Sequence, residues 1–282
     1  MSLTRKSGDM RSLLGILLTG LSGALVLVAL LPLLAVLSYV LIKGFSRLNG
    51  DLLTQLPPPP MVPGGGIANA IVGTLIMVGL AACISVPIGL FSAIYLAEFS
   101  PPGAAKWIRF ATNVLNGVPS IILGVFAYAA LVVTTKTFSA LAGAIALAIL
   151  MLPIIIRTTD EALQIVPQDI RWASVGVGAS NYQTVLQIVV PAALPAIITG
   201  TTLAIARAAG ETAPLIFTAL FTQFWPNSLL QPTPSLSVLV YNFATVPFKN
   251  QQELAWAASL ILVLLVLTTS IVSRLALRQK TY

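Results

Sequence analysis

The chain has 282 residues and a net charge of +7; 57% of its residues are hydrophobic and 8% are charged, against about 25% charged in soluble domains. A soluble domain is therefore excluded, and no basic stripe with interleaved aromatics indicates nucleic acid. There is no histidine, and the single cysteine, Cys83, lies in an apolar run, which excludes disulfides, His- or Cys-based metal sites and nucleophile–histidine pairs. We expect an all-α, polytopic membrane protein without cofactor, metal or nucleic-acid partner.

Six apolar runs are long enough to form transmembrane helices, because about 20 helical residues cross the hydrocarbon core. In chain order they are 13–42, 67–96, 110–133, 138–156, 189–221 and 254–274. The first run is too long for a signal-peptide core and lacks a clear cleavage site, so we expect it to be retained. The predicted parts are a tail over 1–12, a six-helix domain over 13–274 and a tail over 275–282. Four prolines are expected to kink or loosen these helices: Pro87, Pro119, Pro153 and Pro195.

The basic residues are divided unequally between the two sides of the membrane that six crossings define. Four fall on one side: Lys43, Arg47, Lys136 and Lys249. Ten fall on the other: Arg5, Lys6, Arg11, Lys106, Arg109, Arg157, Arg171, Arg274, Arg278 and Lys280. Because cytoplasmic segments carry the excess of Lys and Arg, we expect both termini in the cytoplasm and a location in the plasma or inner membrane.

The connection 157–188 falls on the same cytoplasmic side and is far longer than the usual 4–6 residues. Its composition favours amphipathic helices rather than an irregular loop. Gly178 lies near its middle, and a glycine adopts positive φ without strain. We therefore predict two short helices joined at Gly178 that dock on a partner; the alternative is a surface connection with no partner.

A motif within this connection supports the docking prediction. Trp172-Ala173-Ser174 is followed by Gly178 and, after nine further residues, by the segment IVVP that ends at Pro191. This pattern resembles the EAA motif of ABC importer permeases, E-A-A-x-x-x-G-x(9)-I-x-L-P. Trp172 replaces the glutamate of the motif, and Ser174 replaces its second alanine. The resemblance implies that five residues couple the chain to a separate ATPase: Trp172, Ala173, Ser174, Gly178 and Pro191.

The fifth apolar run carries two ionisable residues, Arg207 and Glu211, in the segment RAAGETAPL. A charge at the centre of a transmembrane helix costs about 2.5–3.5 kcal/mol, so such residues usually have a function. A spacing of four places both on one helix face, where they can pair. The guanidinium fork matches oxyanions bidentately, so we predict that Arg207 contacts an anion in a pore and that Glu211 orients it. The alternative is an ion pair that only holds helices together.

Residues near the Arg207–Glu211 pair are weaker candidates for lining a substrate path. Gly210 and Pro214 flank Glu211 and are expected to loosen the helix there, as in many transporters. Three further residues either line a substrate path or form hydrogen bonds between helices: Thr212, Asn116 and Ser120.

Three segments extend the resemblance beyond the connection. NAIVGTLIMVGLAACISVPIGLFSAIYLAEF (69–99) and NGVPSIILGVF (116–126) resemble phosphate importer permeases, and AIARAAGETAPLIFTAL (204–220) is similar to the fifth span of their PstA family. The resemblance implies a type I ABC importer permease fold, phosphate as substrate and an arginine at 207 that transport requires. It also implies four kinds of partner: a PstC-like second permease subunit, two copies of a PstB-like ATPase, an external PstS-like phosphate-binding protein and membrane lipid.

Other functions remain as alternatives. The chain has no G-x-x-x-x-G-K-[ST] segment, so we expect no ATPase site and no enzymatic activity of its own. The guanidinium chemistry alone also fits an ABC permease for molybdate or sulfate. An ion-driven secondary carrier is expected to show two matching halves, and none are visible in the sequence. A membrane-embedded enzyme would need more acids or histidines inside the membrane.

Overall fold

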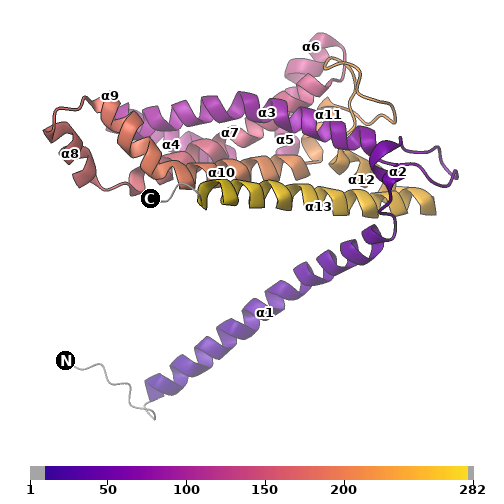
Figure 1. Cartoon of the computed structure of the whole chain (residues 1–282), viewed down its shortest axis with the longest axis horizontal. Coiled ribbons are helices and arrows are strands. Elements are labelled where there is room, and N and C mark those ends of the chain that lie inside the picture. Colours follow the sequence, from indigo (N-terminus) through magenta and orange to yellow (C-terminus); the bar gives the residue numbers. More distant parts are fainter. Residues whose placement is uncertain (1–9, 279–282) are drawn as a thin grey trace.

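The computed structural model describes residues 10–278, which form helices and loops with no strand among them (Figure 1). Five helices in this range are long and apolar enough to cross a membrane. They are α1 (Met10–Phe45), α3 (Ala68–Ile94), α7 (Ala140–Ile165), α10 (Val190–Gly210) and α13 (Lys249–Arg278). The predicted all-α membrane fold is confirmed. Most of the predicted tails, 1–9 and 279–282, lies outside the described residues, whereas 10–12 and 275–278 belong to α1 and α13.

The third predicted span, 110–133, is not one straight helix. It consists of α4 (Pro102–Asn116) and α5 (Ser120–Ala127), and α5 continues through the π-helical η2 (Tyr128–Val132) into α6 (Val133–Thr135). The two parts meet at 97°, and a sixth crossing exists only if they count as one broken span. Pro119 causes the break, because it has no N–H to donate and disfavours helical geometry at the residue before it. The prediction of a disturbed helix at Pro119 is confirmed, and the prediction of a continuous helix over 110–133 is wrong.

The fifth predicted span, 189–221, is also broken. Helix α10 ends at Gly210, Glu211 is extended with φ −73° and ψ 130°, and α11 (Ala213–Thr218) begins just after it. Pro214 occupies the first turn of α11, where a missing N–H costs nothing. The hydroxyl of Ser237, in the short α12 (Leu236–Thr245), donates to the Glu211 carbonyl at 2.8 Å. The break therefore has its freed backbone group satisfied inside the bundle.

The two broken segments pack against each other around α7. A Cβ on Gly124 of α5 would lie 2.7 Å from Cα of Pro214, so the α5 and α11 backbones approach closely. Helix α7 also packs along α3, with Gly89 against Ile155, and along α10, with Gly200 against Thr158. These contacts make α7 the most buried of the membrane helices, with 61% of its apolar window buried.

Helix α1 leans away from this bundle (Figure 1). Its apolar window is only 6% buried, and it meets α13 near its C-terminal end, where Gly44 approaches Trp256 and Leu260. The short α2 (Gly50–Thr54) follows it at that end of the bundle. At the opposite end α8 (Gln168–Gly176) and α9 (Asn181–Thr184) project beyond the bundle (Figure 1). We call these the α2 end and the α8 end.

Candidate functional site

Arg207 and Glu211 form an ion pair at the break that follows α10. The distance from Arg207 Nε to Glu211 Oε1 is 3.4 Å, and the side chains are 49% and 16% exposed. Glu211 is the residue after the last turn rather than part of the helix, so the predicted pairing arises at a helix end and not on one continuous helix face. The acid is held inside the bundle, and half of the arginine side chain is accessible.

The accessible side of Arg207 faces a cavity of about 360 Å³. Three helical segments line it: Asn116 ends α4; Ile154, Arg157 and Thr158 lie on α7; Leu203 and Arg207 lie on α10. The Asn116 amide donates to the Pro153 carbonyl at 3.4 Å, which ties the kink after α4 to α7. Two of the predicted path residues, Arg207 and Asn116, therefore share one cavity.

The other three predicted path residues do not line this cavity; Glu211 is near it only as the partner of Arg207. Thr212 is the half-buried residue before α11 and lies next to the ion pair, but does not line the cavity. Ser120 begins α5 beyond the kink and does not line it either. Arg157 and Thr158 could not be added from the sequence, because their position opposite Arg207 depends on how α7 packs against α10.

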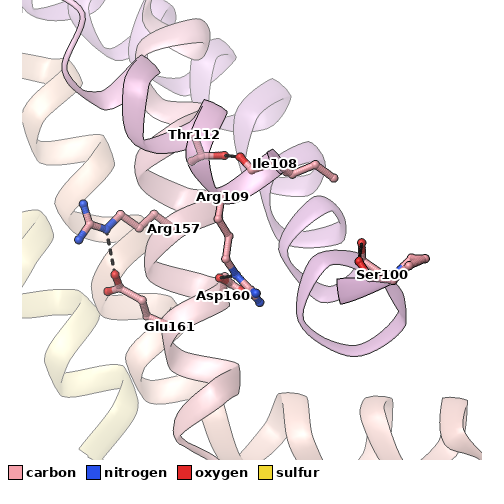
Figure 2. Close-up of polar contacts among 8 residues, drawn as sticks. Ser100, Ile108, Arg109, Thr112, Arg157, Asp160 and Glu161 are labelled. Carbon is pink, nitrogen blue, oxygen red and sulfur yellow. Dashed lines mark hydrogen bonds and ion pairs between the residues drawn. The ribbon is translucent and has the colours of Figure 1, made fainter. Parts of the chain in front are cut away.

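A second cavity, of about 250 Å³, lies nearer the α8 end of α7. Its polar lining consists of Arg109, Thr112, Asn113, Arg157, Asp160, Glu161 and Gln164. Arg109 donates from Nε and Nη2 to the two carboxylate oxygens of Asp160 at 2.7 and 2.9 Å, joining α4 to α7. Figure 2 shows Arg157 extending away from that pair and towards Glu161. The distance from Arg157 Nε to Glu161 Oε1 is 2.9 Å. Arg157 lines both cavities.

The predicted coupling segment is a helix–turn–helix at the α8 end. Gly178, between α8 and α9, has φ +95°, in the left-handed region expected for a glycine hinge. Ser174 of α8 is buried and lies within hydrogen-bond distance, 2.9 Å, of the Thr184 hydroxyl in α9. Trp172 is 66% exposed, with Val175, Val177 and Tyr182 exposed nearby in the chain. Trp172, which stands where the motif has a glutamate, therefore exposes an aromatic ring.

A mostly buried ion pair, with side chains 14% and 10% exposed, anchors this segment to the bundle. Nη2 of Arg171 in α8 lies 2.7 Å from Oε1 of Glu98 in η1 (Tyr95–Phe99), the π-helical end of α3. The same nitrogen donates to the Leu163 carbonyl of α7 at 2.9 Å. Arg171 therefore ties α8 to two membrane helices at once. Pro191, the end of the predicted motif, is exposed in the first turn of α10.

A bundle of broken membrane helices, a charged cavity at the breaks and a projecting helical pair define an integral membrane transport component. Residues 85–280 match the family described as "Binding-protein-dependent transport system inner membrane component". Curated relatives narrow the class. The phosphate transport system permease protein PstA of Yersinia pestis is 40% identical over 266 residues, covering 93% of this chain and 89% of that protein. The chain belongs to the PstA family of phosphate transport system permease proteins.

Other curated relatives support membership of the PstA family, and solved structures support the fold. PstA of Haemophilus influenzae is 40% identical over 265 residues, covering 94% of each chain. The probable PstA of Methanocaldococcus jannaschii is 33% identical and covers 91% of each chain. Two solved structures support the permease fold. One belongs to a methionine ABC transporter, with a TM-score of 0.62 and 22% identity, covering 77% of this chain and 96% of that one. The other belongs to a bacterial alginate ABC transporter, with a TM-score of 0.65 and 14% identity, covering 91% of this chain and 92% of that one.

Proposed function

We infer that this chain is the permease subunit of an ATP-driven phosphate importer and forms half of its translocation channel. The observation that carries this is the Arg207 guanidinium, half exposed on a cavity and steadied by Glu211 from one side. A guanidinium keeps its charge at all physiological pH values and offers paired donors to a tetrahedral oxyanion. The names of the relatives supply phosphate as the oxyanion.

Passage requires an anion to bind and then leave, and the Arg207–Glu211 pair suits that requirement. Glu211 occupies the guanidinium when no anion is present, so an arriving phosphate exchanges one anionic partner for another. The exchange offsets the cost of dehydrating the ion without producing a tight complex. Asn116 contributes an amide to the same cavity, and Thr212 and Ser120 are polar groups beside the two helix breaks.

The ATPase is proposed to contact this chain at the α8 end. Trp172 and Ala173 are the exposed motif residues of α8 and dock on the ATPase, whereas Ser174 holds α8 to α9 through Thr184. Gly178 is the hinge, and Pro191 marks the return into the membrane. The mostly buried pair of Arg171 with Glu98 supports this, because movement of α8 would be transmitted directly to α3 and α7. The chain contains no Walker A segment, so hydrolysis belongs to other subunits.

The proposed assembly contains one more permease subunit of PstC type, two PstB-like ATPases and a PstS-like phosphate-binding protein. The poorly buried face of α1 supports a heterodimer, since a helix in this position has room for a second membrane subunit or lipid. The α8 end is proposed to face the cytoplasm, with both termini there. The basic residues at that end support this orientation: Lys106, Arg109, Arg157, Arg171 and Arg274.

Replacing Arg207 tests the proposed function. The assembled complex is reconstituted into vesicles with binding protein and ATP, and uptake of labelled phosphate is measured. Arg207→Gln loses two charge-assisted hydrogen bonds of about 1.5–3 kcal/mol each, so uptake should fall at least 100-fold. Arg274→Gln removes an exposed arginine of α13 that lines neither cavity and should transport normally. Phosphate uptake above half of wild type in assembled Arg207→Gln would contradict the proposal, and faster uptake of sulfate or molybdate by the wild type would redirect it.

A further inference from the structure

Arg157 has no role in the function proposed above, yet it lines both the Arg207 cavity and the second cavity towards the α8 end. We propose that Arg157 is a second phosphate-binding residue, which receives the ion from Arg207 and passes it to the second cavity. The inference rests on the proposed function, because it names a further binding residue on the same route.

The packing of α7 against α10 fixes where the two arginines stand. Gly200 of α10 contacts Thr158 of α7, so these residues lie at the same level of two antiparallel helices. Arg207 is seven residues beyond Gly200, and Arg157 is one residue from Thr158 in the same direction. At 1.5 Å per residue, their backbones are offset by about 9 Å along the bundle. Arg157 is the one nearer the α8 end, and both side chains still reach one cavity.

The walls of the two cavities carry different charges. The Arg207 cavity is lined by two arginines and by no carboxylate, so it attracts and holds an anion. The second cavity is lined by two arginines, Arg109 and Arg157, and by two carboxylates, Asp160 and Glu161. An anion that follows Arg157 into the second cavity therefore moves from a positive wall to a neutral one, where it is held less tightly.

Arg157 also reproduces the local chemistry of Arg207. Each arginine pairs through Nε with a glutamate four residues later, at 2.9 Å for Arg157–Glu161 and 3.4 Å for Arg207–Glu211. Glu161 thus serves as the resting partner of Arg157 in the way that Glu211 serves Arg207. The pair at 157 is exposed on both sides (53% and 59%), so it exchanges its carboxylate for another anion at little cost.

Asn116 supplies a donor that completes the shared cavity. Its amide nitrogen carries two hydrogens, and one is directed to the Pro153 carbonyl. The second hydrogen is available to an ion held by the two guanidinium groups. Because this donor comes from the kink after α4, any movement of α4 against α7 would change how the ion is held.

The test compares Arg157→Gln with Glu161→Gln in the complete transporter, reconstituted with binding protein and ATP. Uptake of labelled phosphate and ATP hydrolysis are measured on the same vesicles. Arg157→Gln should lower uptake roughly 10- to 100-fold, the loss expected for one ionic hydrogen-bond partner, while hydrolysis stays within about two-fold. Glu161→Gln should lower uptake by no more than about three-fold, since it removes the resting partner and keeps the guanidinium.

Two comparisons separate binding from a structural role. If Arg157 served only its ion pair, Glu161→Gln would lose as much uptake as Arg157→Gln, and that result would overturn the inference. Arg47→Gln breaks a pair with Glu253 (3.3 Å) at the α2 end, away from both cavities, and should transport as wild type. If Arg157→Gln does not assemble, Arg157→Met replaces it, because methionine keeps an unbranched side chain without charge: a loss of at least ten-fold in assembled protein supports the inference, and uptake above half of wild type overturns it.

The same experiment distinguishes failure of the inference from failure of the proposed function. No phosphate uptake by the wild type, or normal uptake by Arg207→Gln, would overturn the proposed function. Uptake above half of wild type in Arg157→Gln, with the wild type and Arg207→Gln behaving as proposed, would overturn only the role of Arg157.

Discussion

The contact between Gly200 and Thr158 determines the spacing of α7 and α10, and adding one methyl group there should disturb both cavities. A Cβ on Gly200 would lie 2.6 Å from Cβ of Thr158 and would also meet its hydroxyl. Rotating the Thr158 side chain moves the hydroxyl and the methyl group but leaves Cβ in place. Gly200→Ala must therefore push the two helices apart.

The expected cost follows from two opposing effects. Overpacking a well-packed contact typically costs about 1–3 kcal/mol. Here the overlapping atom is bound directly to the backbone and cannot rotate away, so we expect a cost of about 3 kcal/mol. Alanine is favoured over glycine inside a helix by about 1 kcal/mol. We therefore expect Gly200→Ala to lower the free energy of unfolding by about 2 kcal/mol, and to lower phosphate uptake because the arginines move apart.

The assay is reversible denaturation in mixed micelles, combined with phosphate uptake by reconstituted complexes. Gly79→Ala is the matched control, because Gly79 lies in α3 and a Cβ added to it would meet nothing within 4 Å, so this variant should be neutral or slightly stabilising. Thr158→Gly removes the atoms that the new methyl group meets, so the double variant should show a coupling energy of at least about 1 kcal/mol. A Gly200→Ala protein as stable as wild type, or no rescue by Thr158→Gly, would refute the reasoning.

Three further predictions concern the α8 end. Gly178→Val places a β-branched residue at φ +95° and should lower the phosphate-stimulated ATPase activity of the assembled transporter at least several-fold. Gly176→Ala should leave that activity unchanged, because a Cβ added at Gly176 meets nothing within 4 Å. Glu98→Gln removes the carboxylate partner of the mostly buried Arg171, which keeps its bonds to backbone carbonyls, and should destabilise the protein by about 1–3 kcal/mol in the denaturation assay; an unchanged stability would argue against the pair as an anchor. Trp172→Ala should reduce co-purification of the ATPase about ten-fold without lowering the unfolding midpoint, because the ring is exposed; equal retention would remove Trp172 from the docking face.

Two kinds of feature could be predicted from the sequence. Long apolar runs identify membrane helices because about 20 apolar residues have few other uses, and five of the six runs contain a long apolar helix. Glycine at 178 predicted a positive φ because no other residue adopts it as easily, and the structure confirms it. Both predictions depend on properties of single residues or short segments.

Features that depend on packing between distant segments could not be predicted. Hydropathy treats 110–133 and 189–221 as continuous, because it does not register that proline and extended backbone interrupt a helix inside an apolar run. Helix α12 was missed, since ten apolar residues are too few for a span. Arg157 counted only as a positive charge at the end of a span. Its place opposite Arg207 follows from the level at which Gly200 meets Thr158, which no local pattern records.

The two Arg–Glu pairs differ in a way that suits successive steps of one route. The main-chain carbonyl of Glu211 accepts from Ser237, and only 16% of the Glu211 side chain is exposed, so Arg207 gives up a partly buried carboxylate when it binds an anion. Arg157 and Glu161 are both more than half exposed, and exposed pairs of this kind contribute about 0–1 kcal/mol. An anion must therefore displace a partly buried carboxylate at Arg207 and only a well-solvated one at Arg157. The direction of transport comes from ATP hydrolysis in the other subunits; the two Arg–Glu pairs determine only how readily phosphate replaces each glutamate along the route.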